Sequence, residues 1–322
     1  MNTADNARSE TSGLGWLFFI SMFVHLLAML GFNLLSDKGF EFPVEVTLVV
    51  SELTILIPAV IYVLVKNLDL RNDLGFRRLK PGTVLMCILL TMFVSPVASF
   101  VNVVSQLFVS NTMTQMSDTL LGGSGIAVWF LTAVYGPFCE EFVFRGIFCN
   151  RYEQYVGPLR AGFISAMLFG LAHMNINQAA YVFVLSVIFS IINRAAGSVL
   201  PSLIIHMCIN GFNMLMMFAM AGAAKSLGRE TDLAQAAELA RGSDILYMMI
   251  AVTFVISIIS IAIAIPCVVW IAKHEDNFEA LHDMFANKHE NAGWLRVSTV
   301  LGICLVLFVM FGLPQLLEII DG

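Results

Sequence analysis

The sequence has little charge. Only 12% of its 322 residues are Asp, Glu, Lys or Arg, whereas 58% are hydrophobic. A soluble globular protein carries roughly 25% charged residues, so this chain cannot cover a water-facing surface of its size. A formal net charge of −6 and the lack of a basic stripe also exclude the electrostatic footprint of nucleic-acid binding. We therefore expect a lipid bilayer as the main solvent and no nucleic-acid partner.

Metal and disulfide patterns are also missing. None of the six cysteines belongs to a CxxC pair, and all lie in or beside apolar runs, where cysteine acts as a small apolar side chain. No HExxH occurs, which excludes a zinc motif built on one helix. The sequence shows no internal repeat, low-complexity segment or soluble domain. We expect a single integral membrane domain over residues 1–322.

The sequence instead contains long apolar runs. A spanning helix needs about 20 mostly apolar residues, and lipid offers no partner for unpaired backbone groups. The first run exceeds the roughly 7–15 residues of a signal-peptide core, so we interpret it as a membrane span. The sequence predicts an all-α, polytopic membrane helix bundle with about 8–9 transmembrane helices. The nine candidate spans are roughly Leu14–Leu35, Val46–Val65, Val84–Val109, Gly125–Phe144, Ala161–His173, Ala179–Ile192, Val199–Ala221, Ile245–Ala272 and Val297–Leu317.

Two of these runs are short. Ala161–His173 and Ala179–Ile192 are separated only by a polar stretch, Asn175–Gln178. They could form a tight helical hairpin, or one span with a re-entrant piece. Two polar connectors, residues 225–244 and 274–291, have apolar residues at helical spacing and predict surface or interfacial helices.

Loop charge predicts the orientation. With the N-terminus in the cytoplasm, 12 Lys and Arg residues lie on the cytoplasmic side and 4 on the other, with Arg145 set aside. Positive residues favour the cytoplasmic side, so we expect a multi-pass protein of the plasma (cytoplasmic) membrane with a cytoplasmic N-terminus.

Ionisable residues inside apolar helices are costly and mark functional sites. Most of them fall between residues 140 and 210, in a motif-bearing core that we place at about 125–221. Outside it, Glu52 could face the same cavity or make a helix–helix hydrogen bond. The complete set is His25, Glu52, Glu140, Glu141, Arg145, His173 and His206, with Asn210 as a polar neighbour.

Three short motifs carry these residues. In the first, Glu141 and Arg145 are four apart and can pair on one helix face. Glu140 lies about 100° around the helix, without a local cation, and is free for chemistry. The second motif places Phe169 four residues before His173, and the third is HxxxN. Each alone is weak, because interfacial charges and helix–helix hydrogen bonds explain it equally well.

Their combination indicates hydrolysis. A glutamate, two histidines and an asparagine can activate water and stabilise an oxyanion. The same carboxylate and imidazoles could instead bind a divalent metal such as zinc. The depth of His173 in the membrane fits poorly with that of Glu140, because His173 falls at the far end of a short span.

At these residues the sequence resembles the CPBP family, the CAAX-protease and bacteriocin-processing group also called Abi. This family includes the type II CAAX prenyl endopeptidases. The strong resemblance runs from about Pro137 to Asn210, and Leu74–Arg78 resembles a basic loop common upstream in the family. The resemblance implies an all-helical intramembrane endopeptidase. Its motifs are Glu140-Glu141-x-x-x-Arg145, Phe169-x-x-x-His173 and His206-x-x-x-Asn210.

The resemblance also implies roles. Glu140 and His173 would activate the water, and His206 and Asn210 would stabilise the oxyanion. The supporting residues would be Glu141, Arg145 and Phe169. The family was once considered metal-dependent and is now assigned a metal-free glutamate mechanism, so we expect no cofactor but leave zinc open.

The expected substrate is a membrane-associated peptide or protein, prenylated or a precursor. Two other functions fit the same polar cluster. The chain could be a non-catalytic membrane regulatory or binding protein, or a proton-coupled transporter, although the missing repeat disfavours the latter. The sequence gives no indication of oligomeric state.

Overall fold

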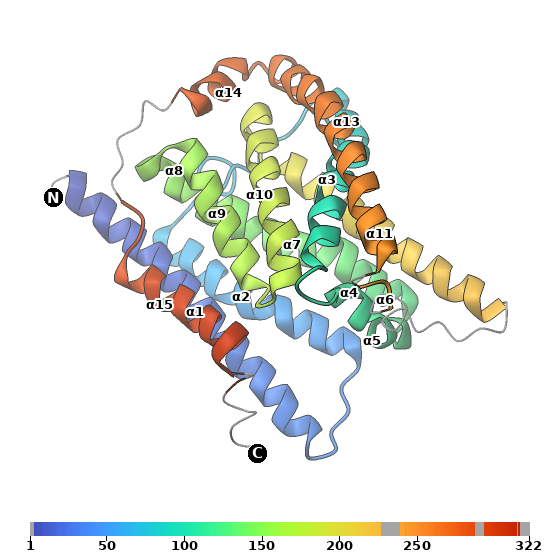
Figure 1. Ribbon diagram of the computed structural model, residues 1–322. Coiled ribbons are helices and arrows are strands. Elements are labelled where there is room, and N and C mark those ends of the chain that lie inside the picture. Colours follow the sequence, from blue (N-terminus) through green and yellow to red (C-terminus); the bar gives the residue numbers. More distant parts are fainter. Residues whose placement is uncertain (1–2, 227–238, 242, 287–292, 314, 316–322) are drawn as a thin grey trace.

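The computed structural model describes residues 3–226, 239–241, 243–286, 293–313 and 315. Within these residues the chain forms helices and no strands (Figure 1). In chain order they are α1 (Thr3–Ser36), α2 (Val44–Lys66), α3 (Pro81–Ser105), α4 (Thr112–Gln115), α5 (Ser117–Gly122), α6 (Gly125–Phe130), η1 (Leu131–Tyr135), α7 (Gly136–Glu140), η2 (Glu141–Cys149), α8 (Asn150–Val156), α9 (Pro158–Ala172), α10 (Ile176–Ala196), α11 (Leu200–Ser226), α13 (Asp244–His274), α14 (Phe278–Phe285), α15 (Val297–Leu307) and η3 (Phe308–Gly312).

The predicted all-α membrane bundle is confirmed. Seven helical segments of the described chain are long and apolar enough to cross a membrane. The fifth and ninth predicted spans are the shorter apolar helices Pro158–Ala172 and Val297–Gly312. Each of the nine predicted apolar runs therefore overlaps a helix of the described chain.

Several spans extend beyond their predicted ends, and polar tertiary contacts accompany two of these extensions. The fourth continues to Val156, because Arg151 reaches Glu10 of α1 and keeps a polar segment within the bundle, 3.4 Å away. The sixth begins at Ile176, since buried Asn177 donates to Asn102 and Ser105 of α3. Hydropathy misses such ends because it does not register tertiary hydrogen bonds.

The two short runs form a helical hairpin. Helix α9 has 15 residues and ends at Ala172, whereas α10 has 21 and is full length. Between them, Met174 turns the chain in a left-handed conformation at φ 51°. Asn175 then caps α10 by accepting a hydrogen bond from the Gln178 N–H. The polar stretch is therefore the turn of the hairpin and the first turn of α10.

The motif-bearing helices form the centre of the bundle (Figure 1). In its most apolar window, the span 125–156 has 44% of its residues buried, as does α10. For α1 and α2 the share is 22%, and for α13 it is 11%. Helices α1, α2 and α15 pack together, and α13 packs along α3. The outer helices thus present their apolar surface to lipid.

One predicted connector is a helix. Helix α14 lies across one end of the bundle, with Leu281 and Met284 buried and Phe278 and Phe285 exposed (Figure 1). The other connector, residues 225–244, falls largely outside the described residues.

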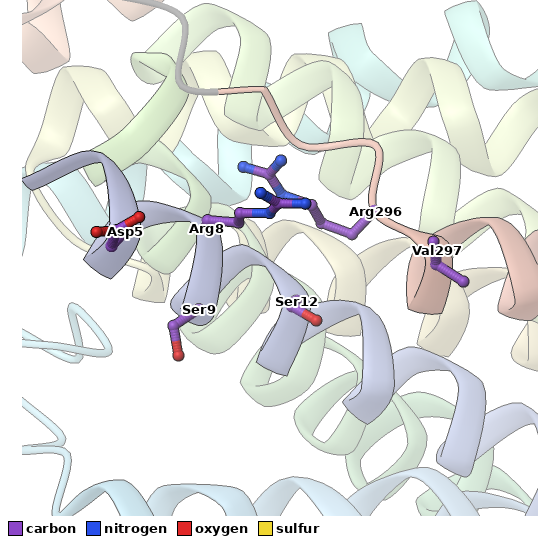
Figure 2. A pocket seen from close by; sticks show the side chains of 6 residues that line it. All are labelled: Asp5, Arg8, Ser9, Ser12, Arg296 and Val297. Atoms are coloured by element: carbon purple, nitrogen blue, oxygen red, sulfur yellow. The ribbon is translucent and has the colours of Figure 1, made fainter.

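A pocket of about 380 Å³ lies where the start of α1 meets the start of α15 (Figure 2). Arg296 donates from Nε to Thr11 Oγ1 over 2.8 Å, which ties the two helices together there. None of the lining residues belongs to the three motifs. They are Asp5, Arg8, Ser9, Ser12, Arg296 and Val297.

Candidate active site

The span Gly125–Val156, here called the central helix, changes its winding around Glu140. Residues 131–135 and 141–149 are π-helical, and Glu140 ends the α-helical turn between them. The predicted span is therefore helical, but these two segments have π instead of α winding. Isolated π turns occur mostly at functional sites.

The carbonyls of the π segments accept bonds from neighbouring helices. Ser165 of α9 donates to the Phe144 carbonyl over 2.6 Å, and Asn210 of α11 donates to the Thr132 carbonyl over 3.2 Å. These contacts fix the central helix against both partners.

Glu141 and Arg145 form a fully buried ion pair. Glu141 Oε2 lies 3.2 Å from Arg145 Nε, and the side chains are 0% and 1% exposed. The guanidinium carbon lies 4.3 Å from the centre of the Phe169 ring and 5.4 Å from that of Phe189. Two aromatic faces and one carboxylate thus surround a guanidinium group that is shielded from solvent.

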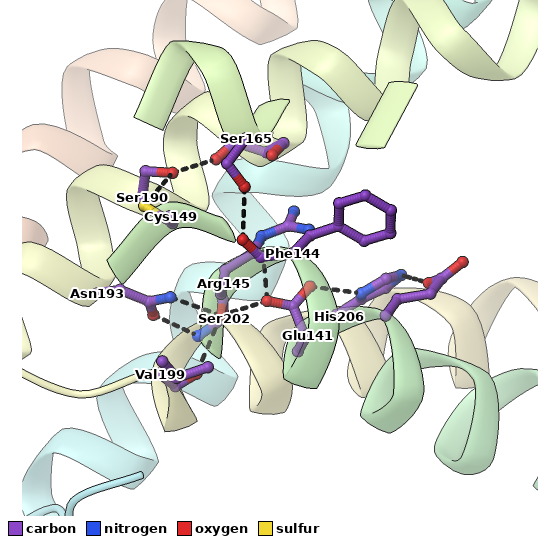
Figure 3. Close-up of polar contacts among 12 residues, drawn as sticks. Glu141, Phe144, Arg145, Cys149, Ser165, Ser190, Asn193, Val199, Ser202 and His206 are labelled. Carbon is purple, nitrogen blue, oxygen red and sulfur yellow. Dashed lines mark hydrogen bonds and ion pairs between the residues drawn. The ribbon is translucent and has the colours of Figure 1, made fainter. Parts of the chain in front are cut away.

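Ser202 adds a hydrogen bond to this pair. Its Oγ donates to Glu141 Oε2 over 2.6 Å and accepts from Asn193 Nδ2 over 2.7 Å (Figure 3). Arg145 and Ser202 both stabilise the anionic form of Glu141, so this carboxylate is held as an acceptor.

His206 lies between the two glutamates. Its Nδ1 is 3.0 Å from Glu141 Oε1, and its Nε2 is 3.5 Å from Glu140 Oε2. Figure 3 shows the imidazole next to the Glu141 carboxylate. Because Glu141 is held as an anion, Nδ1 carries a proton and donates to it. Nε2 is then the atom directed at Glu140.

His173 approaches Glu140 from the other side. Its Nδ1 lies 3.0 Å from the Phe169 carbonyl, and its Nε2 lies 3.7 Å from Glu140 Oε1. A carbonyl only accepts, so Nδ1 carries the proton and neutral His173 presents an unprotonated Nε2. The separations of 3.5 and 3.7 Å are longer than ordinary direct hydrogen bonds, so a water beside the pair could contact both groups.

The short length of α9 explains how His173 reaches the same depth in the membrane as Glu140. His173 is the C-cap of this short helix, which ends beside Glu140 instead of continuing past it. The C-terminal end of α9 therefore lies at the same level in the bundle as Glu140 and Glu141.

Asn210 is held beside the site but not against Glu140. It lies one helical turn after His206, and its Nδ2 donates to the Thr132 carbonyl. The second N–H of the amide stays available for another acceptor. The structure thus brings Glu140, Glu141, His173 and His206 into one contact group and joins Asn210 to it through the central helix.

Four contributors were missed from the sequence. Ser202 precedes His206 by four residues, so an SxxxH spacing could have indicated it. Thr132, Phe189 and Asn193 act through tertiary contacts and have no comparable signal.

No group of three or more His, Cys, Asp or Glu within the described residues is placed to hold a metal ion. Both Nδ1 atoms are already engaged, by a carboxylate and by a carbonyl. The remaining Nε2 atoms face a carboxylate at distances suited to water.

Comparisons with known proteins agree with this geometry. Residues 122–212 match the family model described as type II CAAX prenyl endopeptidase Rce1-like. Comparison with curated proteins gave no match, and neither did comparison with solved structures. The matched stretch contains all three motifs and supports an intramembrane CAAX-type endopeptidase at the family level. The resemblance of this chain to the CPBP family is therefore confirmed by its Rce1-like region, residues 122–212.

Proposed function

We propose that this protein is an intramembrane endopeptidase that uses Glu140 to activate water. One observation carries the proposal. Two imidazole Nε2 atoms flank the two oxygens of Glu140, at 3.5 and 3.7 Å, from two other helices. Neither histidine is placed there by local sequence, so the tertiary fold assembles the group.

The attack step follows from the tautomers. A water between Glu140 and His173 can donate one hydrogen to the carboxylate and the other to the unprotonated Nε2. As its oxygen attacks the peptide carbonyl, Glu140 takes the proton. Glu140 then returns that proton to the leaving nitrogen when the C–N bond breaks.

The charges indicate how the oxyanion is stabilised. Since His206 Nδ1–H donates to anionic Glu141, Nε2 becomes a donor when the ring is an imidazolium. With Arg145 and His206 positive and both motif glutamates negative, the cluster is neutral overall, which suits a low-dielectric site. The imidazolium and the free N–H of Asn210 would then bind the oxyanion.

The substrate we propose is a membrane-associated peptide, prenylated or a precursor. The chain would lie in the plasma membrane with a cytoplasmic N-terminus. Comparing cleavage of one peptide with and without a prenyl group tests the first point. Reporter fusions after α1 and after α2 test the second.

The central test is Glu140→Gln in detergent with a fluorogenic peptide. We expect kcat to fall by roughly 10²–10⁴ because the general base is lost. Glu45→Gln is the matched control, because Glu45 lies on α2 and accepts the Ser124 N–H at 2.6 Å, a bond that the amide oxygen can keep. Its activity should match the wild type.

An active Glu140→Gln variant would overturn Glu140 as the residue that activates water, and a wild type that cleaves no peptide would leave a binding protein or a transporter. Activity that disappears with a chelator and returns with zinc would instead show that a metal activates the water.

A further inference from the structure

A third carboxyl group lies beside the motif glutamates. Glu52 of α2 directs its carboxyl group at Gly136 of α7, where an added Cβ would lie 3.4 Å from Glu52 Oε1 and 3.7 Å from its carboxyl carbon. Gly136 is buried, and α2 packs directly on α7. The Glu52 carboxyl group therefore lies within van der Waals reach of the Gly136 position.

This position is close to Glu140. Gly136 and Glu140 are four residues apart in one α-helical segment and therefore share a face. Helical side chains lean toward the N-terminus of their helix, so Glu140 leans over the turn that contains Gly136. The Glu52 carboxyl group and the Glu140 side chain therefore lie on the same face of α7.

Glu52 differs from Glu140 in its partners. Its Oε2 is buried and has no hydrogen-bond partner among the described residues. Arg145 pairs with Glu141, both motif histidines face Glu140, and His25 is bonded to Thr54 at 2.8 Å. The other titratable groups that interact with Glu52 are Tyr135 and Cys139, which are neutral.

Charge balance then predicts different protonation states for the two carboxyl groups. The proposed active cluster is neutral when Glu140 is ionised, so ionising Glu52 as well would leave an unbalanced negative charge in low dielectric. Two carboxylates at one site disfavour each other, and one of them keeps a proton. Only Glu140 has imidazole partners that favour its anion.

We propose that Glu52 is a positioning residue that stays protonated beside Glu140 and so leaves Glu140 as the ionised base. This inference rests on the proposed endopeptidase function. The neutral Glu52 O–H donates a hydrogen bond toward Glu140 or the hydrolytic water. No proton leaves Glu52 in the cycle, because the water proton goes to Glu140 and then to the leaving nitrogen.

The key variant is Glu52→Gln, which fixes a neutral group of the same shape. At pH about 7 we expect kcat/KM within about threefold of wild type. Raising the pH to about 9 drives wild-type Glu52 toward its ionised form, whose charge opposes both ionised Glu140 and the oxyanion. Glu52→Gln should then exceed the wild type by at least about threefold. Glu45→Gln should follow the wild type at both pH values.

Infrared difference spectra test the protonation without activity. Purified wild type minus Glu52→Gln should show the carbonyl band of a protonated carboxylic acid at neutral pH, and wild type minus Glu45→Gln should not. Absence of this band, or the same activity ratio at both pH values, would overturn the Glu52 proposal. If the wild type itself cleaves no peptide, the endopeptidase proposal has failed, and if Glu140→Gln stays active, Glu140 is not the base.

Discussion

The central helix and the outer helix α13 are stabilised within the membrane by different surroundings. The span 125–156 has a mean hydropathy of 1.3 with 44% of that window buried, whereas α13 reaches 2.8 with 11% buried. Lipid stabilises α13, so apolar side chains suffice. The central span instead stabilises its polar groups with one another. Low hydropathy within a membrane bundle thus marks the helix that carries chemistry.

The two helices also differ in their winding, which is regular in α13 and irregular in the central helix. Helix α13 stays α-helical over 31 residues, even past Pro266. The central helix switches twice into π geometry around Glu140. The π segments there are held by hydrogen bonds from α9 and α11, which lipid cannot supply. A third π segment, η3 (Phe308–Gly312), lies outside the site, in the helix that continues α15.

Breaking the central ion pair should have the largest effect. Arg145→Met leaves Glu141 buried without its cation, and we expect a loss of about 3–5 kcal/mol in unfolding free energy. Denaturation in mixed micelles measures it. Glu141→Gln combined with Arg145→Met should recover most of the stability but not the activity. Equal stability of the single variant and wild type would contradict a structural role for the pair.

Asn210→Ala should have the next largest effect. Losing one oxyanion donor costs about 10²–10³ in kcat, or roughly 3 kcal/mol, with KM little changed. Initial rates on the fluorogenic peptide measure this. Asn210 also bonds the Thr132 carbonyl, so thermal stability is recorded in parallel. A variant that loses stability and keeps its kcat would show that Asn210 only holds the central helix.

The smallest effects should come from lipid-facing positions of α13. Ile259 is 55% exposed in the bundle and Ile271 is 0% exposed. Ile259→Ala should change stability by less than about 0.5 kcal/mol. Ile271→Ala, on the same helix, should cost about 2–5 kcal/mol because it opens a cavity. Similar losses for both would show that α13 is covered by protein at Ile259.

Sequence reasoning located the motifs but not their contacts. The pairing of Glu141 with Arg145 followed from their spacing of four residues, and the structure has the two groups 3.2 Å apart. The contact of Glu141 with His206 joins positions 65 residues apart, which no local pattern encodes. Glu52 lay outside the predicted site, because only packing of α2 on Gly136 brings it near Glu140.

By itself the sequence determined the membrane class, the helical fold and the residues able to do chemistry, because hydropathy and side-chain type are local properties. Tertiary structure alone decided the π turns, the short α9 that brings His173 to the level of Glu140, and the tautomers of both histidines. Each depends on which atoms from distant helices meet, and in lipid a buried polar group adopts the geometry that its partners impose.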